Sequence, residues 1–129
     1  MTGTTPAAPV RPGLPTTLVT GARPIDRERA IASLLQPGID TAVIIEGLAD
    51  PSTPLANDGV QATILRIAPG CLCCAGNLVL RVTLNRLLRR PPARLFISLA
   101  DATHVGQLRA LLSAQPYDSL LSLENDVTA

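Results

Sequence analysis

Short β-prone runs alternate with helical stretches along this 129-residue chain, and this alternation is the feature that most limits how it can fold. The β-prone runs occupy residues 16–20, 41–46, 62–67, 94–99 and 119–123. Apolar residues recur at helical spacing in residues 24–36, 76–90 and 103–114. Strands that are joined through helices run parallel with right-handed crossovers, and the helices then cover both faces of the sheet. We therefore expect an α/β fold with a mostly parallel sheet and helices on both faces.

The first 15 residues differ from the rest of the chain in composition. They are rich in Thr, Ala and Pro and have few large apolar side chains. A segment of this kind cannot bury enough apolar surface to offset the entropy that it would lose on folding. We expect a disordered, Pro-rich tail at residues 1–15 and a single folded domain at residues 16–129.

The charged and aromatic residues exclude several classes of protein. The net charge is +1 and the aromatic residues are Phe96 and Tyr117, whereas nucleic-acid-binding proteins carry a basic excess and aromatic side chains that stack on bases. All 11 residues of the Lys and Arg class are arginines, which excludes Schiff-base chemistry and a phosphate-binding lysine. We expect no nucleic acid partner.

The sequence does not indicate a membrane span or an export signal. Its longest unbroken apolar run, Cys71 to Ala75, has five residues, whereas a transmembrane helix needs about 20. The N-terminus lacks the basic start and hydrophobic stretch of a signal peptide. We expect a cytoplasmic protein that does not contact membranes.

Three cysteines lie within four positions, at Cys71, Cys73 and Cys74. An odd number of clustered thiols does not form a secreted disulfide framework, and in a reducing compartment such thiols indicate metal or redox chemistry. Because Zn²⁺ favours thiolates in a tetrahedral site, the cluster predicts a site for Zn²⁺ or another thiophilic divalent metal. Two alternatives remain open, namely inert buried thiols and a redox-sensing cluster.

A tetrahedral site needs a fourth ligand beyond the three thiolates. Glu46, Asp58 and His104 are the candidates within the chain, and a water molecule or a partner's side chain is equally suitable. His104 lies near the start of a predicted helix, so an exposed or capping role is the simpler interpretation of this residue. The nearby Asp101 is interpreted as a helix N-cap.

The cysteine motif and its position resemble those of a known protein family. The sequence Gly70-Cys71-Leu72-Cys73-Cys74 follows a β-prone run and precedes a helical stretch. It resembles the Gly-Cys-hydrophobic-Cys-Cys motif of the CobW-type GTP-binding metallochaperones, which are related to the nickel-insertion GTPases of urease and hydrogenase. Leu99-Ala100-Asp101 is similar to the family's Gly-Leu-Ala-Asp-Pro segment. The resemblance implies a truncated P-loop-NTPase-like domain, with a metal ion as ligand and a client metalloprotein as partner.

The phosphate-binding loop of that family is degenerate in this chain. Where the family loop ends Gly-Ser-Gly-Lys-Thr, Arg27 falls on the lysine and Glu28 on the magnesium-binding hydroxyl, and Pro24 and Asp26 replace two glycines. The loop binds phosphate through successive backbone N–H groups, so a proline removes a donor and carboxylates repel the ligand. Gly21 and Arg27 are what remains of a nucleotide-binding site, and the segment is predicted to begin an ordinary helix.

Two further parts of a GTPase are missing from the sequence. No acidic residue lies between Gly59 and Ala100, which removes the family's strand glutamate, and no guanine-reading Lys-x-Asp motif follows. We expect a metal-binding protein with a metallochaperone or metal-homeostasis role and no GTP hydrolysis, so that GTP is a doubtful ligand and the chain is not expected to be an enzyme. The first alternative is a divergent but active GTP-binding metallochaperone domain. The second is a thiol redox sensor or a decayed remnant without a ligand.

Three arginines, Arg86, Arg89 and Arg90, lie near the end of a predicted helix. Cations at this end interact favourably with the helix dipole. We prefer that interpretation to the other one, a docking patch for an acidic partner.

Overall fold

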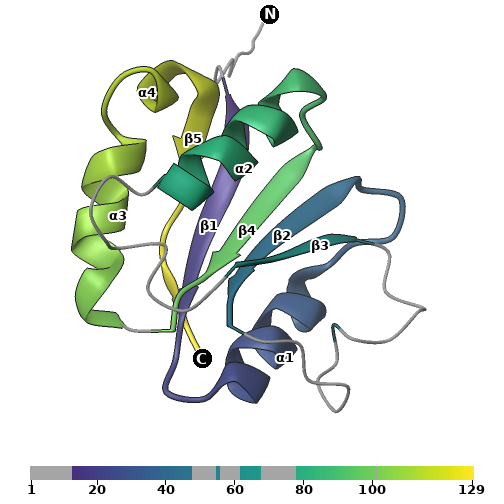
Figure 1. Cartoon of the computed structure of the whole chain (residues 1–129). Helices are drawn as coiled ribbons and strands as arrows, with labels where there is room; N and C mark the ends of the chain where they lie inside the picture. Colours follow the sequence, from purple (N-terminus) through teal and green to yellow (C-terminus); the bar gives the residue numbers. More distant parts are fainter. Residues whose placement is uncertain (1–12, 48–54, 56–61, 68–77, 101) are drawn as a thin grey trace, which may run out of the picture.

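The computed structural model describes residues 13–47, 55, 62–67, 78–100 and 102–129. Its strands form one six-stranded sheet in the order β3-β2-β4-β1-β5, with β6 paired to β1 (Figure 1). The strands are β1 Leu14–Thr20, β2 Thr41–Glu46, β3 Thr63–Ile67, β4 Arg94–Ser98, β5 Leu121–Leu123 and β6 Val127–Thr128. The helices are α1 Pro24–Leu34, α2 Leu78–Arg89, α3 Val105–Leu112 and α4 Tyr117–Leu120, and a short 3-10 helix, Ala102–His104, precedes α3. All the strand pairs are parallel, which confirms the predicted fold class.

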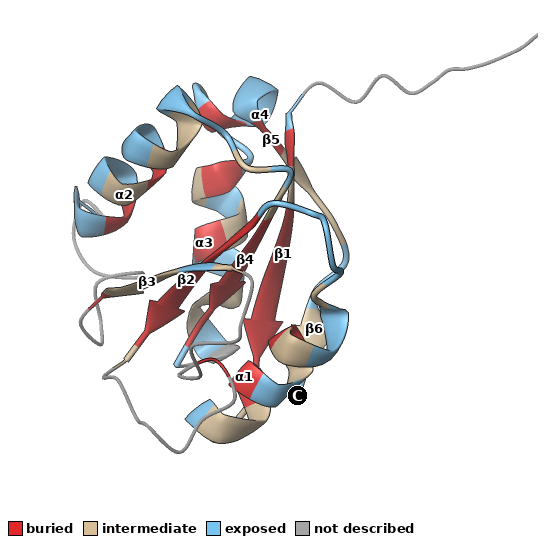
Figure 2. Ribbon diagram, turned by 90° about the vertical axis from the view of Figure 1, so that its right-hand side faces the viewer, coloured by how far each residue is buried: buried red, intermediate tan, exposed pale blue. Residues whose placement is uncertain are grey.

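Helices cover both faces of the sheet. Helix α1 lies on one face, and α2 and α3 lie on the other (Figures 1 and 2). The chain leaves β1 through α1 toward β2, whereas it leaves the neighbouring β4 through α3 toward β5 on the opposite side. The connections that follow these two adjacent strands therefore diverge at their carboxyl ends.

Two hydrophobic cores result from this layering. The larger core lies under α2 and α3 and includes Leu18, Ile44, Leu80, Leu84 and Leu108. The smaller core lies under α1 and consists of Val19, Ile31, Val43, Ile45, Leu55 and Phe96. Neighbouring residues of β2 alternate between the two cores, as side chains in a strand must. Every residue of β2 is buried, which explains its nearly continuous apolar run.

The first strand starts earlier than the sequence predicts. β1 begins at Leu14, which is 5% exposed and belongs to the larger core, so the predicted boundary at residue 16 is wrong by two residues. Pro15 is tolerated because it lies at the start of the strand, where few ladder hydrogen bonds are lost. Of the predicted tail, residues 1–12 lie outside the described residues.

The last predicted strand is also wrong in its first part. Tyr117–Leu120 forms helix α4, and β5 is limited to Leu121–Leu123. Tyr117 and Leu121 are both 4% exposed, whereas Ser119 between them is exposed; the alternation of a strand would place all three residues on one face. β6 was not predicted because Val127–Thr128 is too short to give a pattern. Within the described residues, no helix combines the length and hydrophobicity that a membrane crossing requires.

Candidate functional site

The carboxyl ends of β1 and β4 form the candidate site of this fold. These two strands are adjacent and in register from Thr16↔Leu95 to Val19↔Ser98. Their following connections run to opposite sides of the sheet. In open α/β sheets, ligands bind in the crevice outside the carboxyl ends of strands at such a switch point. A phosphate-binding loop after β1 would therefore place its ligand here.

The side chain of Arg27 lies at this switch point. Its Nε donates a hydrogen bond to Ser98 Oγ at 3.0 Å, and its Nη1 donates one to the carbonyl oxygen of Gly21 at 2.7 Å. Arg27 is 2% exposed, although it carries a charge and lies near the start of α1. The guanidinium thus connects the residue after β1 with the last residue of β4.

The start of α1 engages two amides of the predicted loop in helix hydrogen bonds. The helix begins at Pro24, so the position that matches the family's lysine already lies within the helix. The N–H groups of Asp26 and Arg27 both donate to the carbonyl oxygen of Arg23, at 3.1 and 3.2 Å. An amide that is committed to the helix ladder cannot donate to a phosphate. The predicted ordinary helix start is found, but its buried arginine was not expected.

Two buried carboxylates accompany Arg27. Glu28 is 2% exposed and forms an ion pair with Arg66 of β3, with a shortest N–O distance of 3.4 Å. Glu46, at the end of β2, is 5% exposed, and its Oε1 accepts a hydrogen bond from the N–H of Ala100 at 2.9 Å. Burial lowers the pKa of Arg27, whereas the charges of Glu46 and Glu28 raise it. The guanidinium remains charged and is compensated by carboxylates of this chain.

Outside the crevice, a second ion pair lies on the surface at the start of α1. Arg23 Nε and Asp26 Oδ2 are 3.0 Å apart, and both side chains are exposed. The hydrogen bond from Arg23 lowers the pKa of the Asp26 carboxyl. The exposed Asp26 therefore stabilises the first turn of α1 and is not one of the buried carboxylates that accompany Arg27.

The structure brings together some of the predicted site residues. Gly21 and Arg27 are in contact through the 2.7 Å hydrogen bond. Glu46 lies at the same carboxyl edge of the sheet, whereas His104 ends the 3-10 helix before α3 and is half-buried. The remaining candidates, Cys71, Cys73, Cys74 and Asp58, lie outside the described residues, as does Asp101. Among the residues that are described, no three His, Cys, Asp or Glu side chains form a group that could hold a metal ion.

The sequence gives no sign that Ser98 and Arg66 belong to this region. Both residues lie within predicted strands, at residues 94–99 and 62–67. One usable signal was present, because Arg27 and Ile31 lie four residues apart and share the buried face of α1. A charged residue on the same helical stripe as a core isoleucine indicates a buried charge with partners.

The chain is similar to a curated bacterial protein. It is 32% identical over 115 residues to the zinc chaperone YeiR of Escherichia coli (strain K12), and the aligned part covers 84% of this chain and 34% of YeiR. The chain therefore spans about a third of the length of that relative. YeiR is a zinc chaperone of the CobW family, so the match supports the resemblance that the cysteine motif indicates. No protein-family model matches the chain, and no solved structure matches it.

Proposed function

We propose that this chain is a CobW-type metal-binding domain that holds Zn²⁺ through Cys71, Cys73 and Cys74 and serves in metal delivery or metal homeostasis without hydrolysing GTP. The three thiols within four positions and the similarity to a zinc chaperone support the metal-binding part. The bound zinc ion would pass to a client metalloprotein. This role places the domain in the cytoplasm, where thiols stay reduced and available for a metal.

The thiolates supply the chemistry that zinc prefers. Cysteine binds Zn²⁺ as a thiolate, and metal binding removes the thiol proton. A tetrahedral site on three cysteines needs a fourth ligand, for which Glu46, Asp58 and His104 are the candidates. A carboxylate has about four lone-pair sites, so the hydrogen bond that Glu46 Oε1 accepts from Ala100 leaves this residue suitable as a ligand.

Competition for zinc between the protein and a chromophoric chelator tests the proposed zinc site. Replacement of any one cysteine by Ser should weaken zinc binding strongly, because it removes one of three thiolates. Glu46→Gln and His104→Asn are the matched variants for the fourth ligand, and only the variant that removes a true ligand should lower zinc affinity. A triple Cys→Ser variant that competes for zinc as well as the unmodified protein would contradict the site.

The buried guanidinium of Arg27 is the observation that carries the proposed loss of GTP hydrolysis. It bonds Gly21 and Ser98 at the switch point, which is the position where a phosphate loop would hold its ligand. Phosphoryl transfer requires a preorganised amide cradle and a bound magnesium ion. Here the amides of Asp26 and Arg27 are committed to the carbonyl oxygen of Arg23.

Magnesium-dependent GTP hydrolysis, measured as phosphate release, tests this second part. The protein should release phosphate no faster than buffer, and Arg27→Ala should not change that result. Hydrolysis that is present in the unmodified protein and lost in Arg27→Ala would support the alternative function, a divergent GTPase in which arginine replaces the lysine. Hydrolysis that survives the substitution would contradict the assignment of the loop to this segment.

A further inference from the structure

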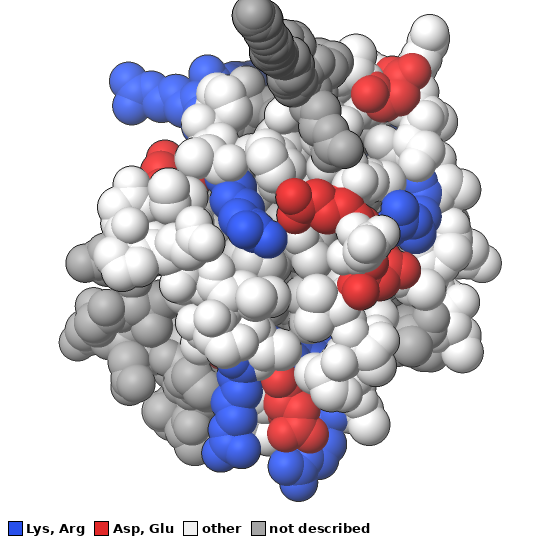
Figure 3. Space-filling view, turned by 180° about the vertical axis from the view of Figure 1, so that it is seen from behind, with Lys and Arg blue, Asp and Glu red and all other residues white. Residues whose placement is uncertain are grey.

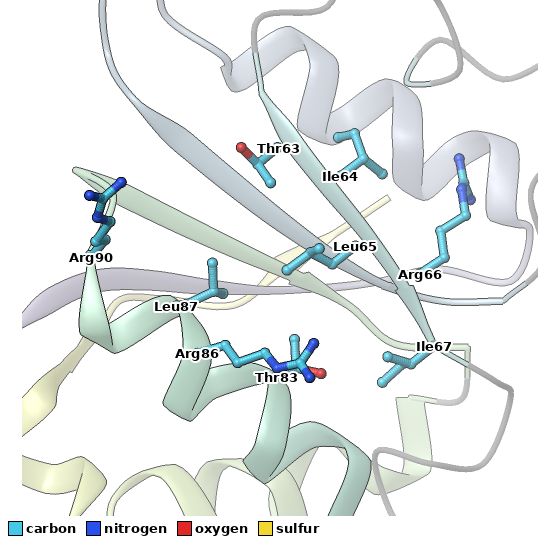
Figure 4. A pocket seen from close by; sticks show the side chains of 9 residues that line it. All are labelled: Thr63, Ile64, Leu65, Arg66, Ile67, Thr83, Arg86, Leu87 and Arg90. Carbon is cyan, nitrogen blue, oxygen red and sulfur yellow. The ribbon is translucent and has the colours of Figure 1, made fainter.

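A groove between β3 and α2 lies away from the crevice at β1 and β4. Its volume is about 480 Å³, and residues of these two elements line it (Figure 4). β3 is the outer strand of the described sheet, so the groove opens at the side of the molecule. Arg27 is not among the described residues that line it.

The groove has an apolar floor and a cationic rim. Leu65 of β3 and Leu87 of α2 are partly buried against the larger core and form the floor. Arg86 of α2 and Arg90, which directly follows the last residue of α2, line the groove on the helix side (Figure 4). The strand residues Ile64 and Arg66 point toward α1 (Figure 4), where Arg66 pairs with Glu28.

The cations on this rim have no acidic partner within the described residues. None of the ion pairs formed there involves Arg86, Arg89 or Arg90. The sequence contains no acidic residue between Asp58 and Asp101. On the opposite side of the molecule, by contrast, acidic and basic side chains are interleaved (Figure 3).

The helix dipole explains only part of this arrangement. It favours cations in the last turn by about 0.3 to 1 kcal/mol, which accounts for arginines at the end of α2. It does not account for an open apolar floor beside them, and Arg86 and Arg90 repel each other because both are cations that line the same groove. An external carboxylate would relieve that repulsion.

The exposed side of α2 extends this surface toward the first turn of the helix. Leu78, Val79 and Val82 are 70%, 44% and 45% exposed. Leu78 follows Cys74 by four residues in the sequence. A partner along α2 would therefore contact the helix that directly follows the proposed zinc ligands.

We infer that the groove between β3 and α2 is the docking site for an acidic segment of the client protein, with carboxylates on Arg86 and Arg90 and an apolar side chain on Leu65 and Leu87. Only one part of the inference rests on the proposed function, namely that the partner is the protein that receives the metal. From Thr83 to Arg90 the helix rises about 10 Å, which matches about three residues of extended chain. The segment that binds is short, and its binding weakens as salt rises because the charges are exposed.

Two labelled peptides test the inference by fluorescence anisotropy. The first is an eight-residue peptide of alternating leucine and glutamate, and the second has lysine in place of glutamate. The acidic peptide should bind the unmodified protein, and Arg86→Glu with Arg90→Glu should weaken binding at least about tenfold because attraction becomes repulsion. The matched control is Arg29→Glu, an exposed residue of α1 on the other face of the sheet, and it should change binding less than about twofold.

The place where the peptide binds and the independence of peptide binding from zinc are measured separately. Amide chemical shifts on addition of the acidic peptide should move in β3 and α2, and thermal unfolding should show that both arginine variants are folded. The triple Cys→Ser variant should bind the peptide as the unmodified protein does, since the proposed contacts are made by the two arginines and the two leucines that line the groove and not by thiols. The inference would be overturned if the lysine peptide bound as well as the acidic peptide, or if Arg29→Glu weakened peptide binding as much as the double arginine variant. It would also be overturned if the Cys→Ser variant lost peptide binding, or if the amide shifts moved outside β3 and α2. A failed zinc experiment would leave these results unchanged.

Discussion

Arg27 shows how a buried cation can be satisfied within one chain. An ion that is removed from water loses several kcal/mol of solvation unless charges and hydrogen bonds replace it. Here Gly21 and Ser98 accept two hydrogen bonds, and Glu28 and Glu46 supply the negative charge. The cation is thus satisfied inside the chain, whereas a phosphate-binding lysine is satisfied by its ligand.

Arg27→Met should therefore destabilise the fold. The substitution keeps an apolar stem but leaves Glu28 and Glu46 without the buried cation, and breaking such a cluster costs about 3 to 5 kcal/mol. Urea unfolding followed by circular dichroism measures the change. Arg29→Met is the control, because Arg29 is exposed on the same helix and should change stability by less than about 0.5 kcal/mol.

A smaller change tests the same contact if Arg27→Met does not fold. Ser98→Ala removes only the acceptor of the Nε hydrogen bond, and loss of a hydrogen bond to a charged group costs about 1.5 to 3 kcal/mol. Equal unfolding midpoints for Ser98→Ala and the unmodified protein would contradict a stabilising role for this contact.

The helices and strands differ in how well the sequence predicts them. β2 and α2 were predicted because a continuous apolar run and a leucine stripe each have one simple interpretation. α4 and β6 were not, because elements of four and two residues give too few repeats to define a period. The start of α1 followed from Pro24, but its buried charged face depends on strands that are distant in sequence.

The start of α1 can be tested by repair of the loop. A four-site variant combines Pro24→Gly, Asp26→Gly, Arg27→Lys and Glu28→Thr. It removes the proline, two carboxylates and the arginine, and it returns the groups that bind phosphate and magnesium. Isothermal titration calorimetry should then detect some binding of GTP in the presence of magnesium. Hydrolysis should stay absent, because no acidic residue lies between Gly59 and Ala100 to position water from the next strand.

The outcome that would contradict this expectation is specific. Rapid GTP hydrolysis by the folded four-site variant, with preference over ATP, would mean that the remaining GTPase parts are present elsewhere in the chain. Asp50, Asp58 or Asp101 would then serve in the place of the missing glutamate.

The C-terminal strands depend on contacts made by Glu124, which lies between β5 and β6. Its Oε1 accepts hydrogen bonds from Thr17 Oγ1 at 2.8 Å and from Arg94 Nη2 at 3.2 Å. Glu124→Ala should lower the free energy of unfolding by about 1 to 2 kcal/mol, because a partly exposed charged acceptor is lost. Asp118→Ala, on the exposed side of α4, is the control in the same urea experiment, and an equal effect of the two would contradict the role of Glu124.

At the scale of the whole molecule, the proposed function separates two activities that the family resemblance joins, namely metal binding and GTP hydrolysis. The sheet order and the switch point of a nucleotide-binding fold are present, but Arg27 occupies the crevice from within. The sequence singled out Arg27 and Gly21, and the structure places the two residues in contact. It could not show the contact with Ser98, which lies 71 residues away and meets Arg27 only when β4 is placed beside β1.

The most direct test of the account is the amount of zinc bound per chain, measured by elemental analysis after purification from cells without added metal. The unmodified protein should hold about one zinc ion per chain, and the variant with Cys71, Cys73 and Cys74 replaced by Ser should hold none. The Arg29→Ala variant should keep its zinc, because Arg29 is exposed on α1 and is not among the proposed ligands. Zinc that is absent from the unmodified protein, or retained in full by the triple variant, would contradict the central claim.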